Sequence, residues 1–219
     1  MNVQSLVAKI ASDLNDNEDG YAYQTWQANQ IRGWIVEGVS LVYEKLPDLF
    51  MQNKIIQVTP CSIIQDTCGC DIIRRVVGQV TESGRLIQPL RQRGLEISFQ
   101  WSGKPCRKAL RAGEVFKLES YAIDDVTDTL YVWPEVPPHI TVYIEVQCAV
   151  RPTDITDNDE VGGAYEAAVI QWVLWRAKSM DMEVSPAALS AAQLHYRAFF
   201  DLLGLSVDAK TVIHKRDNT

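Results

Sequence analysis

The sequence lacks any long uninterrupted hydrophobic run. No apolar stretch reaches the roughly 18 residues that a membrane-spanning helix needs, so we expect no membrane span. Residues 1–4 lead directly into an amphipathic helical pattern, without the apolar core of a signal peptide. We therefore expect a protein that is made in a cytosol.

Signatures of catalysis are also missing. The chain has no GxSxG nucleophile elbow, no phosphate-binding loop and no HExxH pattern. His139, His195 and His214 are far apart, and His195 lies in an alanine-rich helical stretch, where a histidine more often bonds to a neighbour than to a ligand. We expect no catalytic residue and no cofactor, which weakens the hypothesis of an enzyme.

Paired cysteine ligands are absent as well. The chain has five cysteines, an odd number, and they show neither a secreted disulfide spacing nor a CxxC pair. Cys61, Cys68 and Cys70 cluster, with Cys106 further along. Structural zinc sites need two pairs of ligands at close spacing. We therefore expect reduced thiols in loops and in the core, and no metal site.

The chain has no overall excess of positive charge. Its net charge of −7 argues against a dedicated nucleic-acid-binding module, because such modules are usually basic. The charge is nevertheless unevenly distributed. Residues 74–117, here called the basic segment, hold ten Lys or Arg and three acids, whereas residues 118–166, the acidic segment, hold eleven acids and Arg151.

Two interpretations fit this charge separation. The two segments are either two solvated faces or two complementary surfaces that meet between copies of the chain. Asp124, Asp125 and Asp128 could also be read as acid–base groups or calcium ligands, but the EF-hand spacing is absent and a solvated hairpin turn is favoured. The candidate interface residues are Arg74, Arg75, Arg91, Arg93, Arg107, Lys108, Asp124, Asp125 and Asp128.

Apolar residues recur at helical spacing near both ends of the chain. The pattern predicts helices over residues 2–15, 25–46, 159–181 and 186–203. The third is apolar on nearly every side and should be buried at the centre of its domain. Thr25 and Ser185 are candidate helix caps, and Trp26 and Trp34 are candidate core residues.

The middle of the chain shows strand patterns. Strands are predicted from short β-branched or alternating segments at residues 55–58, 72–80, 85–90, 95–101, 115–123, 129–134 and 140–150. The expected fold is α+β, a four-helix bundle with a β-rich insertion between the second and third helices. The expected parts are residues 1–50 and 156–204 for the bundle, 51–155 for the insertion and 205–219 for a tail.

Several segments resemble the head-to-tail adaptor proteins of short-tailed bacteriophages. Trp26 followed by IRGWI is similar to the family's Trp and Leu-Leu-x-Trp-Ile, although Gln27 stands where the family has Ser or Thr. A strand that ends in Trp133-Pro134 precedes a second strand in both. AAVIQWVLWRAKSMDME followed by AAQLHYRAFFDLLG is similar to the family's C-terminal helical pair.

The resemblance implies a structural virion protein that acts through interfaces. Such adaptors form a ring, usually of twelve copies, beneath the portal, and carry the tail nozzle and fibres. The genomic DNA passes through the ring without specific binding. The implied partners are further copies of the chain, the portal protein and nozzle or fibre proteins, in a virion neck assembled in the host cytoplasm. Other virion connectors or head-completion proteins, an enzyme with no recognisable site, and a nucleic-acid-binding module are the alternatives.

Overall fold

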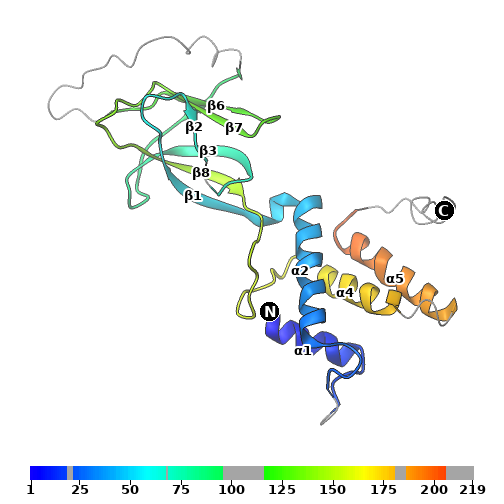
Figure 1. Ribbon diagram of the computed structural model, residues 1–219. Coiled ribbons are helices and arrows are strands. Elements are labelled where there is room, and N and C mark those ends of the chain that lie inside the picture. The colour runs from blue at the N-terminus through cyan, green and yellow to red at the C-terminus, as the bar shows by residue number, and fades with distance from the viewer. Residues whose placement is uncertain (19–21, 68, 96–115, 181–185, 206–219) are drawn as a thin grey trace. The chain divides into compact units, whose positions relative to one another are not determined.

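The computed structural model describes residues 1–18, 22–67, 69–95, 116–180 and 186–205 (Figure 1). The chain divides into two compact units. The helical unit comprises Met1–Leu46 and Pro152–Thr219, and the β unit comprises Pro47–Arg151. No described helix has the length and apolar character needed to cross a membrane.

The helical unit has four α-helices among its described residues. They are α1 (Val3–Asp13), α2 (Ala28–Lys45), α4 (Glu166–Met180) and α5 (Pro186–Leu202). Helix α1 begins where the Asn2 side chain accepts the Ser5 backbone N–H at 2.9 Å, which satisfies one of the free donors of the first turn. Its apolar stripe is buried at Val3, Leu6, Val7, Ile10 and Ala11.

Helix α4 is the most buried of these helices. Its apolar residues lie on nearly all of its sides, and the prediction that it would be buried is confirmed at Ala168, Val169, Ile170, Trp172, Val173, Leu174 and Ala177. Helices α2 and α5 both pack against it. Gly38 permits the close approach of α2, because a Cβ at that position would lie 3.0 Å from Trp172 Cδ1.

The expected four-helix bundle with a β-rich insertion is wrong. The fold is α+β, but its helices do not surround one shared core. The main packing of α5 is on α4, whereas α1 packs on α2 and α4. Apolar periodicity shows which face of a helix is buried, but not which neighbour covers it. Two four-stranded sheets make up the middle of the chain.

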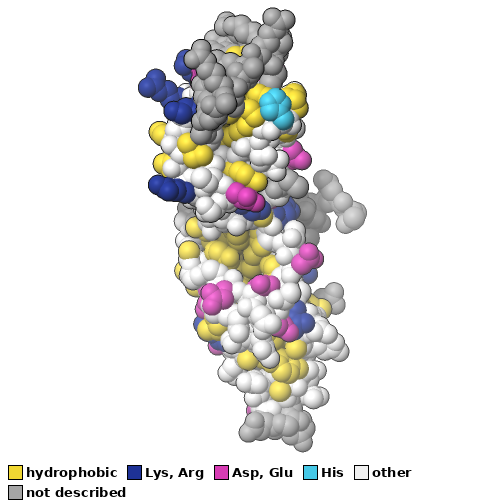
Figure 2. All heavy atoms as spheres, turned by 90° about the vertical axis from the view of Figure 1, so that its left-hand side faces the viewer, with side chains coloured by type: hydrophobic (Ala, Val, Ile, Leu, Met, Phe, Trp, Pro, Cys, Tyr) yellow, Lys and Arg dark blue, Asp and Glu magenta, His cyan; other side chains and the backbone are white. Residues whose placement is uncertain are grey.

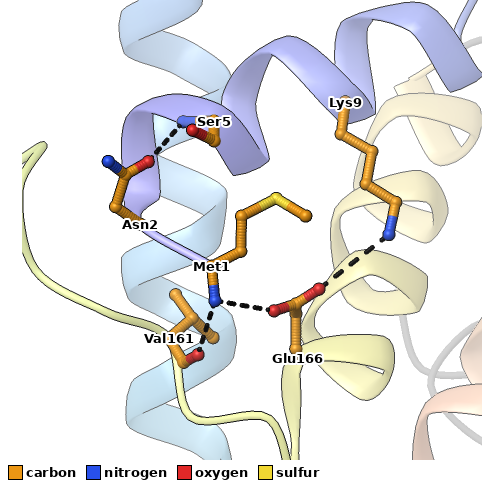
Figure 3. Close-up of polar contacts among 6 residues, drawn as sticks. All are labelled: Met1, Asn2, Ser5, Lys9, Val161 and Glu166. Carbon is orange, nitrogen blue, oxygen red and sulfur yellow. Dashed lines mark hydrogen bonds and ion pairs between the residues drawn. The ribbon is translucent and has the colours of Figure 1, made fainter.

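The start of the chain pairs with the segment that precedes α4. Asn2 forms an isolated antiparallel bridge with Glu160. The N-terminal amine of Met1 lies 3.0 Å from Glu166 Oε2 and donates to the Val161 carbonyl, and Lys9 Nζ lies 3.9 Å from the other oxygen of Glu166 (Figure 3). This extended pairing explains why the third predicted helix begins at Glu166 and not at residue 159.

The loop between α1 and α2 is organised by Asp16, which is 6% exposed. Its carboxylate accepts the backbone N–H groups of Gln24, Thr25 and Trp26, the last at 2.8 Å. Thr25 therefore does not cap α2 as expected; the helix begins after Gln27, whose side chain makes no capping bond. Trp26 packs edge-on against Trp34 in the core, as predicted.

Replacing Asp16 by asparagine should remove a pH-dependent part of the stability. The Trp26 N–H foremost, with those of Thr25 and Gln24, lowers the pKa of Asp16 below its ordinary value of 3.8. The ionised form therefore stabilises the fold fully above the unfolded pKa, and this contribution is lost as the pH falls through the lower folded pKa. Urea unfolding at pH 7 and near pH 2 measures the difference between the two proteins, which should shrink in acid. A difference that stays constant would contradict this role.

The β unit contains two sheets, each with four described strands. The first has the order β1-β8-β3-β4 and the second β2-β7-β6-β5; β5 and β6 are parallel and the other pairs antiparallel. The strands, which follow a short 3-10 helix at Pro47–Phe50, are β1 (Met51–Gln57), β2 (Ile64–Gln65), β3 (Ile72–Val80), β4 (Leu86–Pro89), β5 (Arg91–Gln92), β6 (Ser120–Asp124), β7 (Thr129–Trp133) and β8 (Tyr143–Ala149).

The two sheets enclose one hydrophobic core. The alternation in β8 places Ile144, Val146 and Cys148 in that core, where they meet Leu130 and Val132 of the second sheet. The Gln79 side chain, which is 2% exposed, links β3 to the segment before β6. Its amide donates to the Phe116 carbonyl at 2.8 Å and accepts the Leu118 N–H at 3.0 Å.

A disulfide joins Cys70 to Cys148, so the prediction of reduced thiols is wrong for this pair. The two Cα atoms lie 5.7 Å apart, within the usual range for a disulfide, although 78 positions separate them in sequence. The pairing of β3 with β8 brings them together, because Ile73 lies opposite Cys148. Cys61 is a free, exposed thiol, whereas Cys68 and Cys106 lie outside the described residues.

Candidate assembly surface

The turn between β6 and β7 carries the acidic residues of the expected interface. Asp124 Oδ1 accepts the Val126 backbone N–H at 2.9 Å, and its Oδ2 accepts the Thr127 hydroxyl at 2.8 Å. Asp128 has a positive φ of 49°, a conformation that aspartate tolerates better than most residues. The predicted hairpin turn is confirmed, and the bonds to Asp124 define its path.

The same bonds set the charge of the turn. The Thr127 hydroxyl, followed by the Val126 N–H, lowers the pKa of Asp124 below its ordinary value of 3.8. The carboxylate is therefore ionised at neutral pH. Between the acids stands Val126, which is 91% exposed. The turn thus presents an apolar side chain within an acidic surround, and we call residues 124–128 the acidic tip.

Two arginines of the basic segment lie on the same sheet as the acidic tip. Arg91 is paired with Ser120, the first residue of β6, and the Arg93 N–H bonds to the Tyr121 carbonyl at 2.8 Å. Both side chains are exposed. They therefore flank the beginning of β6, whereas the acidic tip lies at its end.

The remaining basic candidates are divided between β3 and residues that are not described. Arg74 and Arg75 are exposed neighbours on β3. The Arg74 guanidinium forms an ion pair with Asp48 at 2.9 Å, so part of its charge is already compensated within the chain. Arg107 and Lys108 lie outside the described residues.

The described members of the two charge groups form no ion pair with one another within one copy. Among the described residues, no ion pair joins Arg91 or Arg93 to an aspartate of the acidic tip. Figure 2 shows Lys and Arg side chains interspersed with Asp and Glu on the face turned to the viewer, with hydrophobic groups between them. The charge separation in sequence therefore does not appear as a single-sign patch on that face.

A pocket of about 490 Å³ lies at the other end of the β unit's strands from the acidic tip. It forms where β3 ends, where β4 passes and where β8 begins. Gln79, which binds Phe116 and Leu118, forms part of its wall. The residues that line it are Gln79, Val80, Thr81, Glu82, Ile87, Phe116, His139, Ile140, Thr141, Val142 and Tyr143.

Neither the pocket nor the exposure of Val126 was recognised from the sequence. The pocket walls come from separate segments, which only the sheet topology brings together. A signal for the tip was present, because one valine stands among three aspartates in DDVTD. An apolar residue in so polar a turn has no packing reason to be there.

The described residues contain little of what a metal site or an acid–base site would need. No cluster of three or more His, Cys, Asp or Glu there could hold a metal ion. His195 Nδ1 lies 2.7 Å from Gln171 Oε1, which confirms the interpretation of a histidine satisfied by its helical neighbours. Burial foremost, and then the charge of Lys178, lowers the pKa of His195.

Comparison with known protein families identifies the family of this chain. The model of a protein family described as SU10 adaptor protein matches residues 1–216, which is nearly the whole chain. A search of curated proteins finds no sequence that matches.

Proposed function

Because the chain belongs to the SU10 adaptor protein family, whose members are structural components of bacteriophage virions, we propose that it forms a ring beneath the portal. In that ring it extends the DNA channel and provides the attachment surface for the tail nozzle and fibres. The family match over residues 1–216 is the observation that carries this proposal. A virion adaptor of this family works by binding other proteins and not by catalysing a reaction.

The arrangement of charge in the β unit supports a ring of identical copies. A ring needs two different patches on each copy, one of which meets the other patch on the next copy. Arg91 and Arg93 flank the start of β6 and the acidic tip lies at its end, so each copy offers both signs at different places. Exposed ion pairs contribute only about 0–1 kcal/mol each. They set the orientation, and apolar burial must supply the affinity.

The copy number of twelve, the portal and the tail proteins are parts of the same proposal. The DNA passes through the channel without specific binding, because a net charge of −7 favours repulsion of phosphates over adhesion. Assembly takes place in the host cytoplasm and the ring remains in the neck of the virion. The free chain is expected to be monomeric and to close into a ring on the portal.

The test is to mix the purified chain with the portal protein of the same phage. Mass photometry should show a complex that contains one ring of the chain per portal, and cryo-electron microscopy should show that ring coaxial with the portal channel. The chain alone is the control and should remain monomeric. The absence of any complex would reject the proposal. Tight duplex DNA binding with a steep salt dependence would reject the passive channel.

A further inference from the structure

We propose that the acidic tip of one copy, residues 124–128, inserts Val126 into the pocket between β3, β4 and β8 of the next copy. This inference rests on the proposed ring and names the contact that closes it. It commits to a second copy of this chain as the occupant of the pocket. The contact is a heterologous one, since the tip and the pocket are different surfaces of the same unit.

The acidic tip presents an exposed apolar side chain on a preorganised turn, as a binding element would. Val126 is 91% exposed, more than any other large hydrophobic residue described. Exposed apolar residues are common, but this one stands at the end of a hairpin whose turn is fixed by the bonds to Asp124. A preorganised turn loses little conformational freedom on binding, which favours association. Val126 therefore projects from the turn as an apolar side chain that a pocket can bind.

The pocket has the matching properties. Its volume of about 490 Å³ exceeds that of a valine side chain and leaves room for the flanking turn. Val80, Phe116 and Val142 supply a buried apolar wall, and Ile87, which is 42% exposed, lies open to solvent beside them. Insertion of Val126 would bury apolar surface on both partners, at about 25 cal/mol for each Å² removed from water.

Two cations, Arg85 and Lys117, are close in sequence to residues that line the pocket. Arg85 is tied to Thr81, a pocket residue, across the β3–β4 turn: the Thr81 N–H bonds to the Arg85 carbonyl, and the Arg85 N–H bonds to the Thr81 hydroxyl. Lys117 follows Phe116, which lines the pocket. Both cations are exposed, and neither forms an ion pair with a described residue. The lining itself contains one acid, Glu82, and no Lys or Arg. The proposed contact places Asp125 and Asp128 beside the pocket, near Arg85, Lys117 and the two arginines Arg91 and Arg93 at the start of β6.

The positions of tip and pocket suit a ring. Gln79, in the pocket wall, binds Leu118 just before β6, and the tip follows the last residue of β6. The five residues of β6 span about 17 Å at 3.3 Å per residue. Figure 1 shows the turn between β6 and β7 projecting at one end of the β unit. A tip and a pocket at opposite ends of β6 do not meet within one copy, so the proposed contact joins neighbouring copies.

A second pocket makes a poor alternative for the tip. It has a volume of about 270 Å³ and lies in the helical unit, where Val39, Ile155 and Tyr165 form part of its lining. Asp159 and Glu160 also line it. The Thr156 N–H and then its hydroxyl lower the pKa of Asp159, so its carboxylate is ionised at neutral pH and would repel an acidic tip. The lining of this second pocket contains two acids, whereas that of the pocket in the β unit contains one, which favours the β unit as the site for the tip.

Two single substitutions test the contact from opposite sides. Val126→Asp removes the apolar side chain of the tip, and Ile87→Glu places a charge in the pocket. Both residues are exposed, so each variant should keep the circular dichroism and melting temperature of the wild type. In mass photometry with the portal, each should lose at least 90% of the ring. Ile64→Asp is the matched control, because Ile64 is 52% exposed on β2, in the sheet that carries the acidic tip, and does not line the pocket. It should assemble as the wild type does.

The contact itself can be mapped by photo-crosslinking. A diazirine-bearing aliphatic amino acid is placed at position 126, and isotope-labelled and unlabelled copies are mixed on the portal. Crosslinks should join position 126 of one copy to residues 79–87 or 139–143 of another, while a crosslinker at position 64 should not reach them. Normal assembly of Val126→Asp, or crosslinks from position 126 to the portal or elsewhere, would overturn the inference and leave the ring proposal standing. If the wild type forms no ring on the portal, both are rejected.

Discussion

Replacing Trp172 by alanine should lower the free energy of unfolding by about 3–5 kcal/mol, the usual range for deletion of a large core aromatic side chain. Trp172 is 7% exposed. Its ring centroid lies 4.5 Å from that of Trp175 and 5.2 Å from that of Phe199, and its Cδ1 faces Gly38. The Trp172 side chain belongs to α4 and contacts both α2 and α5. Its loss therefore leaves a cavity between three helices.

Urea unfolding followed by circular dichroism measures this loss. Trp172→Phe should lower the free energy of unfolding by less than Trp172→Ala, because phenylalanine keeps much of the ring volume. Among the described residues, Trp172 Nε1 has no hydrogen-bond partner, so its removal leaves no acceptor unpaired. Leu194→Ala is the control: Leu194 is 66% exposed on α5, and its loss should change stability by less than about 0.5 kcal/mol. Equal effects of the two alanine variants would show that α4 is not the central helix.

Reversing Arg91, Arg93 and Arg107 to glutamate should block ring formation and leave the monomer folded. Arg91 and Arg93 are exposed, so their charge contributes little to the fold of a single copy. Across an interface, the reversal turns attraction to Asp124, Asp125 and Asp128 into repulsion, and like charges brought together there cost several kcal/mol. Mass photometry with the portal should show the variant as a free monomer with an unchanged circular dichroism spectrum.

The reciprocal change makes this prediction specific. Reversing the three aspartates to lysine in the same chain should restore the ring, because the pairing is then recovered with opposite signs. A control with Lys45 and Arg197 reversed to glutamate changes exposed cations outside the basic segment and should assemble normally. Normal assembly of the triple arginine variant would mean that the two segments do not meet and are only solvated faces.

Local patterns predicted most of the elements, and long-range pairing accounts for the failures. Strand β3 occupies residues 72–80 as expected, because its β-branched run is bounded by turn residues on both sides. The start of α4 was misplaced because Met1 pairs with residues before it, and no local signal reports such a partner. Strands β2 and β5 have two residues each and are too short to show an alternation. The strand expected at residues 95–101 and the cap expected at Ser185 fall outside the described residues.

The candidate site was only partly accessible to sequence reasoning. The acidic turn could be predicted, because aspartates between two alternating segments are typical of a hairpin. The disulfide could not, since Cys70 lies in a cluster with Cys61 and Cys68 but bonds to Cys148 on a distant strand. The pocket is similarly assembled from β3, β4 and β8 and from the segment before β6. A pattern along the chain cannot show which of these segments become neighbours.

The division of the helical unit into Met1–Leu46 and Pro152–Thr219 has a consequence for synthesis on the ribosome. Helices α1 and α2 emerge first, but the helix that covers their apolar faces is made only after the entire β unit. At about 5–20 residues per second, the stretch from Lys45 at the end of α2 to Met180 at the end of α4 takes roughly 7–27 s to synthesise. The β unit is continuous in sequence and can fold within that interval. The nascent chain therefore carries a finished β unit while the faces of α1 and α2 that pack on α4 are still uncovered, and in those seconds it depends most on chaperones.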